Sequence, residues 1–163
     1  MFITAVLAAT IIPMDAKLTI SDFNGKMGSL MVAKRYDLLT QIATTRFAPE
    51  YVMHKAQGPK LSLIDLAAGG EWEMKNAREG KGDGPVSYKT RLKNWRMENG
   101  AVVVDAHNDV VGEWLKDGRR LPVKFKSVMR ETWIQRDGEW KALRFDELWV
   151  RGTVDGKPIS TKA

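Results

Sequence analysis

The stretch that decides the fold is residues 127–150, SVMRETWIQRDGEWKALRFDELWV, in which two β-rich runs meet at Asp137-Gly138. Asp-Gly between alternating runs predicts a β-hairpin, because both central residues of a type I′ turn need a positive φ. Counting outward from the turn gives four cross-strand pairs: Gln135 with Trp140, Trp133 with Ala142, Glu131 with Arg144, and Met129 with Asp146. This register assigns every side chain of the hairpin to one of the two faces of the sheet.

Two more turns of this kind lie upstream, at Asn99-Gly100 and Asp117-Gly118. The three turns predict a meander of four antiparallel strands: residues 88–97, 101–115, 121–135 and 140–151. One face of this meander is mostly apolar, and we expect it to meet the helices, while the other face meets water or a partner. That other face carries two pairs of opposite charges across the ladder: Asp105 with Arg130, and Asp109 with Lys126.

The residues before the meander carry helical patterns. After Ser21 or Asp22, either of which can cap a helix, apolar residues recur at spacings of three and four: Phe23, Met27, Leu30 and Met31. The elements predicted next are a helix over residues 36–46 that Pro49 ends, a short strand over residues 51–54, and a helix after Ser62. The glycine-rich residues 79–85 are interpreted as a mobile loop, with a plain solvated connection as the alternative.

Composition excludes several classes of site. The 163 residues make one domain, and a hydrophobic content of 44% with six Trp is enough to form a core. The absence of Cys excludes disulfides, thiolate metal sites and a Cys nucleophile. The net charge of +6 comes from basic residues dispersed among acidic ones, which argues against nucleic-acid binding. His107 falls between two carboxylates that already have basic partners, so no metal site is predicted.

Residues 2–14, FITAVLAATIIPM, form the only long uncharged apolar run. The run is too short to span a bilayer as a helix, so no transmembrane span is predicted. It suits either the hydrophobic region of a signal peptide cleaved near Ala16, or an apolar arm that packs on the domain. We therefore divide the chain into residues 1–16 and a single domain over residues 17–163. Cleavage would make the protein extracytoplasmic, periplasmic or secreted, whereas an uncleaved chain would be cytoplasmic.

Five polar side chains fall on the apolar face of the predicted meander: Arg91, Asn108, Glu131, Arg144 and Asp146. Buried charges are costly unless they are paired, so one interpretation is a structural network of Glu131, Arg144 and Asp146. The other is a pocket in which Glu131 or Asp146 accepts a proton, while Arg144 and Asn108 orient a polar group of a substrate. On the same face, Trp95 and Trp133 have flat rings that can stack on a ligand.

The order helix, helix, short strand, helix and meander, ending on a W-x-x-x-D-G-x-W hairpin, resembles the nuclear transport factor 2-like superfamily. Two stretches carry the resemblance, RFAPEYV at residues 46–52 and TWIQRDGEWK at residues 132–141, and it covers residues 18–150. It implies an α+β fold in which the N-terminal helices pack in a curved antiparallel β-sheet, the cystatin-like cone, around an internal pocket. It also implies that His54, with Tyr51 beside it, lies at the pocket mouth as a further candidate base.

Members of this superfamily include ketosteroid isomerases, polyketide cyclases, dehydratases and non-catalytic domains, so the fold alone does not assign a function. No catalytic signature of these enzymes matches the sequence. We expect a small-ligand-binding or association domain that takes a small apolar or aromatic molecule and needs no cofactor. The alternative is a cofactor-independent lyase or isomerase that uses acid-base chemistry in the cone pocket. The resemblance further implies a homodimer through the charged sheet face, which also holds four apolar residues: Leu92, Val103, Val111 and Val128.

Overall fold

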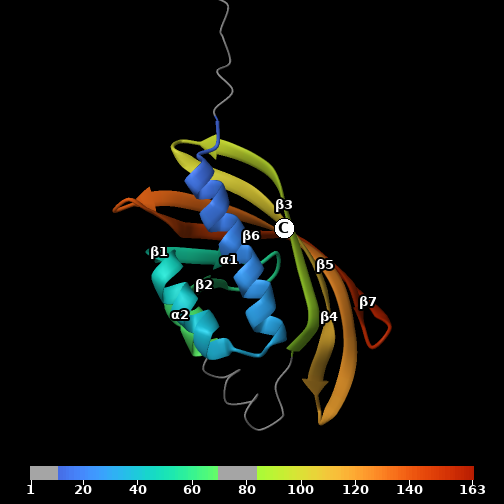
Figure 1. Ribbon diagram of the computed structural model, residues 1–163. Coiled ribbons are helices and arrows are strands. Elements are labelled where there is room, and N and C mark those ends of the chain that lie inside the picture. Colours follow the sequence, from blue (N-terminus) through green and yellow to red (C-terminus); the bar gives the residue numbers. More distant parts are fainter. Residues whose placement is uncertain (1–10, 70–83) are drawn as a thin grey trace, which may run out of the picture.

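A strongly curved sheet wraps around helix α1, which lies on its concave side (Figure 1). The computed structural model describes residues 11–69 and 84–163, so residues 1–10 of the predicted arm and residues 79–83 of the predicted loop lie outside it. The helices are α1 (Met14–Val32) and α2 (Tyr36–Arg46), and residues 63–69 are also helical. The strands are β1 (Phe47–His54), β2 (Lys60–Ser62), β3 (Gly84–Glu98), β4 (Ala101–Lys116), β5 (Arg119–Arg136), β6 (Glu139–Val154) and β7 (Lys157–Lys162).

The strand order is β2-β1-β6-β5-β4-β3, and β7 pairs with the second half of β6. These pairings are antiparallel except that of β1 with β6, so the sheet is mixed rather than purely antiparallel as predicted. The prediction from sequence also ends the sheet before β7, although Asp155-Gly156 is another turn with positive φ at both residues. Helices packed in the concave side of this curved sheet confirm the predicted α+β cone.

The three predicted turns all form, and in each one both central residues have a positive φ, as a type I′ turn requires. The β4–β5 pairing runs without a shift, so its predicted register is confirmed from Val102 opposite Trp133 to Val110 opposite Phe125. Both predicted charge pairs of the convex face are present: Arg130 Nε lies 2.9 Å from Asp105 Oδ1, and Lys126 Nζ lies 3.8 Å from Asp109 Oδ2.

A β-bulge changes the register of the hairpin over residues 127–150. The two pairs nearest the turn form as predicted: Gln135 with Trp140, and Trp133 with Ala142. The register then shifts, and the next pairs are Thr132 with Arg144, Glu131 with Phe145, and Arg130 with Asp146. The predicted partners of Glu131 and Met129 are therefore wrong, because the extra residue on β6 turns Arg144 and Asp146 to the convex face.

A second bulge interrupts β3 at Asn94, which has a φ of 55° and donates from Nδ2 to Asp105 Oδ2 over 3.0 Å. Beyond the bulge, Thr90 rather than Arg91 lies opposite Asn108. The prediction that Arg91 faces the helices is therefore wrong, and its side chain is exposed on the convex side.

Helix α1 begins at Met14, well before the predicted cap, and its first turn belongs to the folded domain. Asp15 Oδ2 accepts a hydrogen bond of 2.9 Å from Trp140 Nε1, and Ala16 and Ile20 are fully buried. Helix α2 spans the predicted residues 36–46. Within the described residues, no helix is long and apolar enough to cross a bilayer.

An aromatic cluster fills the space between α1, β1 and the sheet. The ring of Phe23 meets Trp133 edge-on with centroids 5.0 Å apart, and Phe47 stacks on Tyr51 with centroids 4.1 Å apart. The ring of Phe145 contacts all four of these side chains. Each such pair is worth about 0.5–1.5 kcal/mol beyond the area it buries. This cluster fixes α1 and β1 against β5 and β6.

Candidate functional site

A cavity of about 350 Å³ lies beside the aromatic cluster, between α1, α2, residues 63–67 and the concave face of the sheet. Its walls are largely apolar and come from all of these elements: Phe23, Met27, Leu39, Met53, Leu66 and Phe145. The cavity exists because the curved sheet and the helices cannot pack flat against each other. Glu131 on β5 is the only ionisable carboxyl among its lining residues in the described part of the chain.

Glu131 is held by two hydrogen bonds to the same oxygen. Asn24 Nδ2 donates to Glu131 Oε2 over 3.0 Å, and Trp133 Nε1 donates to Glu131 Oε2 over 2.9 Å. Within the described residues no donor reaches the other oxygen, Oε1, although only 2% of Glu131 is exposed. Oε1 is therefore the polar atom with which a bound molecule can pair.

Burial raises the pKa of Glu131 from its ordinary value of 4.5 to about 7, and the two donors only partly oppose this shift. Burial, and then the charge of Glu131, also raise the pKa of Tyr88 to about 12, and the same causes raise that of Tyr51. Both phenols are thus neutral O–H groups near a carboxyl that titrates close to neutrality. Perturbed groups of this kind gather at functional sites more often than elsewhere.

Four of the predicted site residues belong to this region. Tyr51, Asn108 and Glu131 line the cavity, and Asn108 Oδ1 accepts a hydrogen bond of 2.8 Å from Thr90 Oγ1. Trp133 is fully buried behind Glu131, so it acts as a hydrogen-bond donor and is not open for the predicted stacking on a ligand. Trp95 packs against the core without lining the cavity.

The other predicted site residues lie on the convex side. Asp146 Oδ1 lies 2.8 Å from His54 Nδ1 and 2.8 Å from Arg144 Nε, which makes a separate ion-pair cluster. His54 reaches this cluster because β1 runs parallel to β6 and places it opposite Asp146. The predicted network of Glu131 with Arg144 and Asp146 is therefore wrong. Together with Arg91, these residues stand outside the cavity, on the opposite face of the sheet.

Two residues of this candidate site are missing from the prediction made from the sequence. Asn24 is an amide on the apolar side of α1, between Phe23 and Met27, and that placement is the signal that could have found it. Tyr88 stands near the start of β3 and has no comparable signal. In the described part of the chain, no group of three or more His, Cys, Asp or Glu side chains could hold a metal ion.

Comparison with solved structures identifies the fold. A nuclear transport factor 2-like protein from Cytophaga hutchinsonii superposes with a TM-score of 0.60 at 15% identity, over 82% of this chain and 98% of that one. The protein Aln2 from a Streptomyces species gives a TM-score of 0.59 at 15% identity, over 84% and 92%. A nuclear transport factor 2-like protein with a cystatin-like fold, from Novosphingobium aromaticivorans, gives 0.52 at 14% identity, over 80% and 79%.

These similarities define the chain as a protein of the cystatin-like cone fold. It is the fold of the nuclear transport factor 2-like proteins, and the resemblance stated from the sequence is confirmed at that level. No protein-family model matches the sequence, and no curated protein matches it. Identities of this size establish a shared fold and leave the function to be argued from the site.

Proposed function

We propose that this domain binds a small, largely apolar molecule in the cavity and holds it by one polar contact to Glu131 Oε1. The observation that carries the proposal is a buried carboxyl with one oxygen doubly hydrogen-bonded and the other without a partner among the described residues. The cavity volume of about 350 Å³ lies at the small end of the range for small-molecule sites, roughly 300–1,000 Å³. The ligand is therefore small.

The two N–H donors decide where Glu131 carries its proton. Because both of them point at Oε2, that oxygen acts as an acceptor in either protonation state, and the neutral acid carries its hydrogen on Oε1. The neutral form then donates to a ligand carbonyl, whereas the ionised form accepts from a ligand hydroxyl. A pKa of about 7 makes both forms present near neutral pH.

A second function, acid-base catalysis by a lyase or isomerase without a cofactor, is favoured by the same pKa. A general acid or base works best when its pKa lies near the operating pH, and Glu131 meets this condition in a mostly apolar cavity. Tyr51 and Tyr88 supply neutral O–H groups near the carboxyl. If the parent converts a bound carbonyl compound and Glu131→Gln does not, catalysis is favoured over simple binding.

Binding is tested by thermal shift with naphthalene, 2-naphthol and 2-naphthaldehyde. At about pH 8, where Glu131 is mostly ionised, we expect 2-naphthol to raise the melting temperature more than naphthalene does. At about pH 5, where Glu131 is mostly neutral, we expect 2-naphthaldehyde to raise it more than naphthalene does. Glu131→Gln presents a permanent N–H donor in place of Oε1, so it should favour the aldehyde at both values.

The control for the site is a pair of adjacent alanines. Ala67 lines the cavity, whereas its neighbour Ala68 is exposed and does not. Ala67→Phe should fill the cavity and abolish the shifts, and Ala68→Phe should keep them. If none of the three compounds shifts the parent, or if Ala67→Phe responds as the parent does, the cavity is not the binding site.

A further inference from the structure

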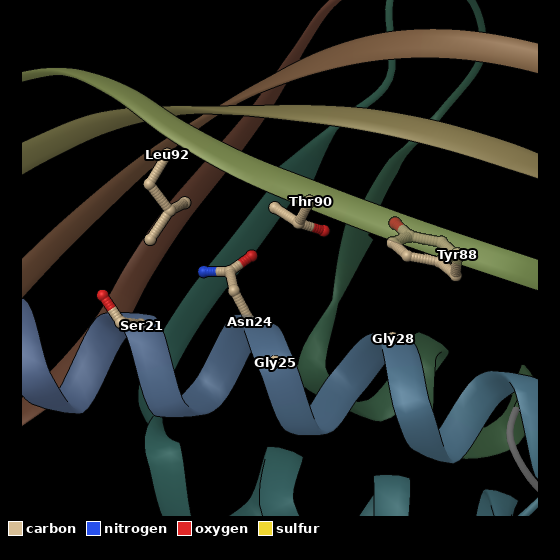
Figure 2. Close-up of a pocket in the computed structure, with 7 residues that line it drawn as sticks. All are labelled: Ser21, Asn24, Gly25, Gly28, Tyr88, Thr90 and Leu92. Atoms are coloured by element: carbon tan, nitrogen blue, oxygen red, sulfur yellow. The ribbon is translucent and has the colours of Figure 1, made fainter.

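A second pocket, of about 300 Å³, opens between the first helix and the edge strand (Figure 2). We refer to it as the α1–β3 gap. Four of its lining residues belong to α1 and three to β3: Ser21, Asn24, Gly25, Gly28, Tyr88, Thr90 and Leu92. In Figure 2 the side chain of Asn24 rises from α1 toward β3, and the side chains of Thr90 and Leu92 point back toward the helix.

Two glycines shape this gap. A Cβ on Gly28 would lie 3.1 Å from Tyr88 Cδ1, so the helix and the strand are in close contact at that point. One turn earlier, a Cβ on Gly25 would meet nothing within 4 Å. The helix therefore touches β3 near Gly28 and leaves unfilled space beside Gly25.

Asn24 and Tyr88 line both the gap and the main cavity, so they form the wall between the two. The side-chain amide of Asn24 makes two hydrogen bonds: its Nδ2 donates to Ile20 O of the same helix over 3.1 Å and to Glu131 Oε2 over 3.0 Å. One amide side chain thus stands between the gap and the buried carboxyl.

The lining of the gap is polar where that of the cavity is apolar. Its polar groups are hydroxyls and an amide, from Ser21, Asn24 and Thr90. Thr90 Oγ1 donates a hydrogen bond to Asn108 Oδ1, and Asn108 lines the main cavity. A bound water needs two to four polar partners and occupies about 30 Å³, so the gap has room for several. On the other side of the cavity, the lining residues are mostly apolar, and they come from α2 and residues 63–67.

We propose that the α1–β3 gap is a water and proton port to Glu131, separate from the apolar region that a ligand occupies. A hydronium ion in the gap gives its proton to the carboxylate and leaves as water, and the reverse step returns the proton to solvent. Asn24 acts as a positioning residue: with Trp133 it holds Oε2 as an acceptor, so the proton enters and leaves at Oε1. Glu131 thereby exchanges its proton with solvent by a route that avoids the apolar side of the cavity.

Hydrogen-deuterium exchange of the tryptophan indoles tests this port without any ligand. The Trp133 indole N–H donates to Glu131 Oε2, whereas the Trp140 indole N–H donates to Asp15, and Asp15 does not line the gap. Both rates are read in the same NMR spectra of the full chain, so Trp140 is an internal reference. The plugging variant is Ser21→Phe, and its matched control is Ser29→Phe, an exposed position on the same helix outside the gap.

Ser21→Phe should slow exchange at Trp133 by about tenfold and leave Trp140 unchanged, because it closes the route without changing global stability. Ser29→Phe should change neither rate. Gly25→Leu is an independent plug, suited to a position with free space around its Cβ, and decides the matter should Ser21→Phe not fold. Unchanged exchange at Trp133, or equal slowing at both indoles, would overturn the port. Because no ligand is used, this result is independent of whether the cavity binds one.

Discussion

The side-chain amide of Asn24 donates to Glu131 over 3.0 Å and so joins helix α1 to the central strand β5, two elements that are 107 residues apart at this contact. With the indole of Trp133, it fixes Oε2 and leaves Oε1 as the free end of the carboxyl. Glu131 is thus a carboxyl that is buried, hydrogen-bonded on one side only and located among apolar groups.

Glu131 makes the stability of the domain depend on pH. Its pKa rises from 4.5 to about 7 on folding, so the folded state holds the proton more tightly than the unfolded state. The resulting stability is complete below pH 4.5 and is lost as the pH rises through 7, a loss of about 3 kcal/mol. Glu131→Gln is neutral at every pH and keeps an oxygen for both donors, so it should exceed the parent in stability at about pH 8.

Urea unfolding at about pH 5 and about pH 8 measures this difference. Glu113→Gln is the control, because Glu113 is an exposed glutamate whose replacement should leave the pH dependence in place. A parent whose stability stays level between the two pH values would show that Glu131 is not a buried acid of raised pKa.

Trp133 and Trp140 are 0% and 6% exposed, and each anchors the hairpin to α1. Replacement of either by Ala should cost about 3 to 5 kcal/mol, the usual range for deletion of a buried large aromatic side chain. Trp114, at 43% exposure, is the matched control, and Trp114→Ala should cost far less. Thermal melts of the three variants measure these losses of stability. A melting temperature for Trp133→Ala close to that of Trp114→Ala would contradict the packing of the aromatic cluster.

The first turn of α1 should be needed for full stability. Removal of residues 1–16 deletes the Asp15 acceptor of Trp140 and the buried Ala16, and should lower the free energy of unfolding by about 1 to 3 kcal/mol. Removal of residues 1–10 leaves both of these in place and is the matched control. Equal stability of the two truncated chains would mean that cleavage after Ala16 costs the domain nothing.

The convex face remains a proposed homodimer surface, with fewer apolar contacts than the sequence implies. Leu92 packs toward the core, and Val103 and Val128 are each only 3% exposed within the single chain. Val111, at 37% exposure, is the apolar side chain left for a partner. Sedimentation at micromolar concentration should give a dimer that Val111→Lys weakens by placing like charges across the interface. A monomeric parent would return this face to solvent.

The turns of the sheet can be predicted from the sequence because their chemistry is local. Asn-Gly and Asp-Gly meet the need for positive φ without help from the rest of the fold, and all three predicted turns form. The bulges cannot be predicted in this way. Leu143, the extra residue of β6, has no feature that sets it apart from its neighbours, yet it decides that Arg144 and Asp146 face outward.

Glu131 could be placed in the concave side because its register depends on the β4–β5 pairing, which has no bulge. Its hydrogen bond to Asn24 could not be predicted, because Asn24 comes from a helix whose contacts with the sheet no local pattern encodes. β7 carries the Asp155-Gly156 signal, but the following run, KPISTK, contains Pro158, which argues against a strand in the middle of a sheet. It pairs along one edge only, where Pro is tolerated.

The most direct test of the central claim is a carbon-13 NMR titration of the Glu131 side-chain carboxyl, with Asn24→Leu beside the parent. We predict a midpoint of about 7 in the parent. In Asn24→Leu the midpoint should be higher still, because a donor that stabilises the charged form has been removed. A parent midpoint near 4.5, the ordinary value for glutamate, would mean that the carboxyl is solvated, and would contradict the site proposed for ligand and proton alike.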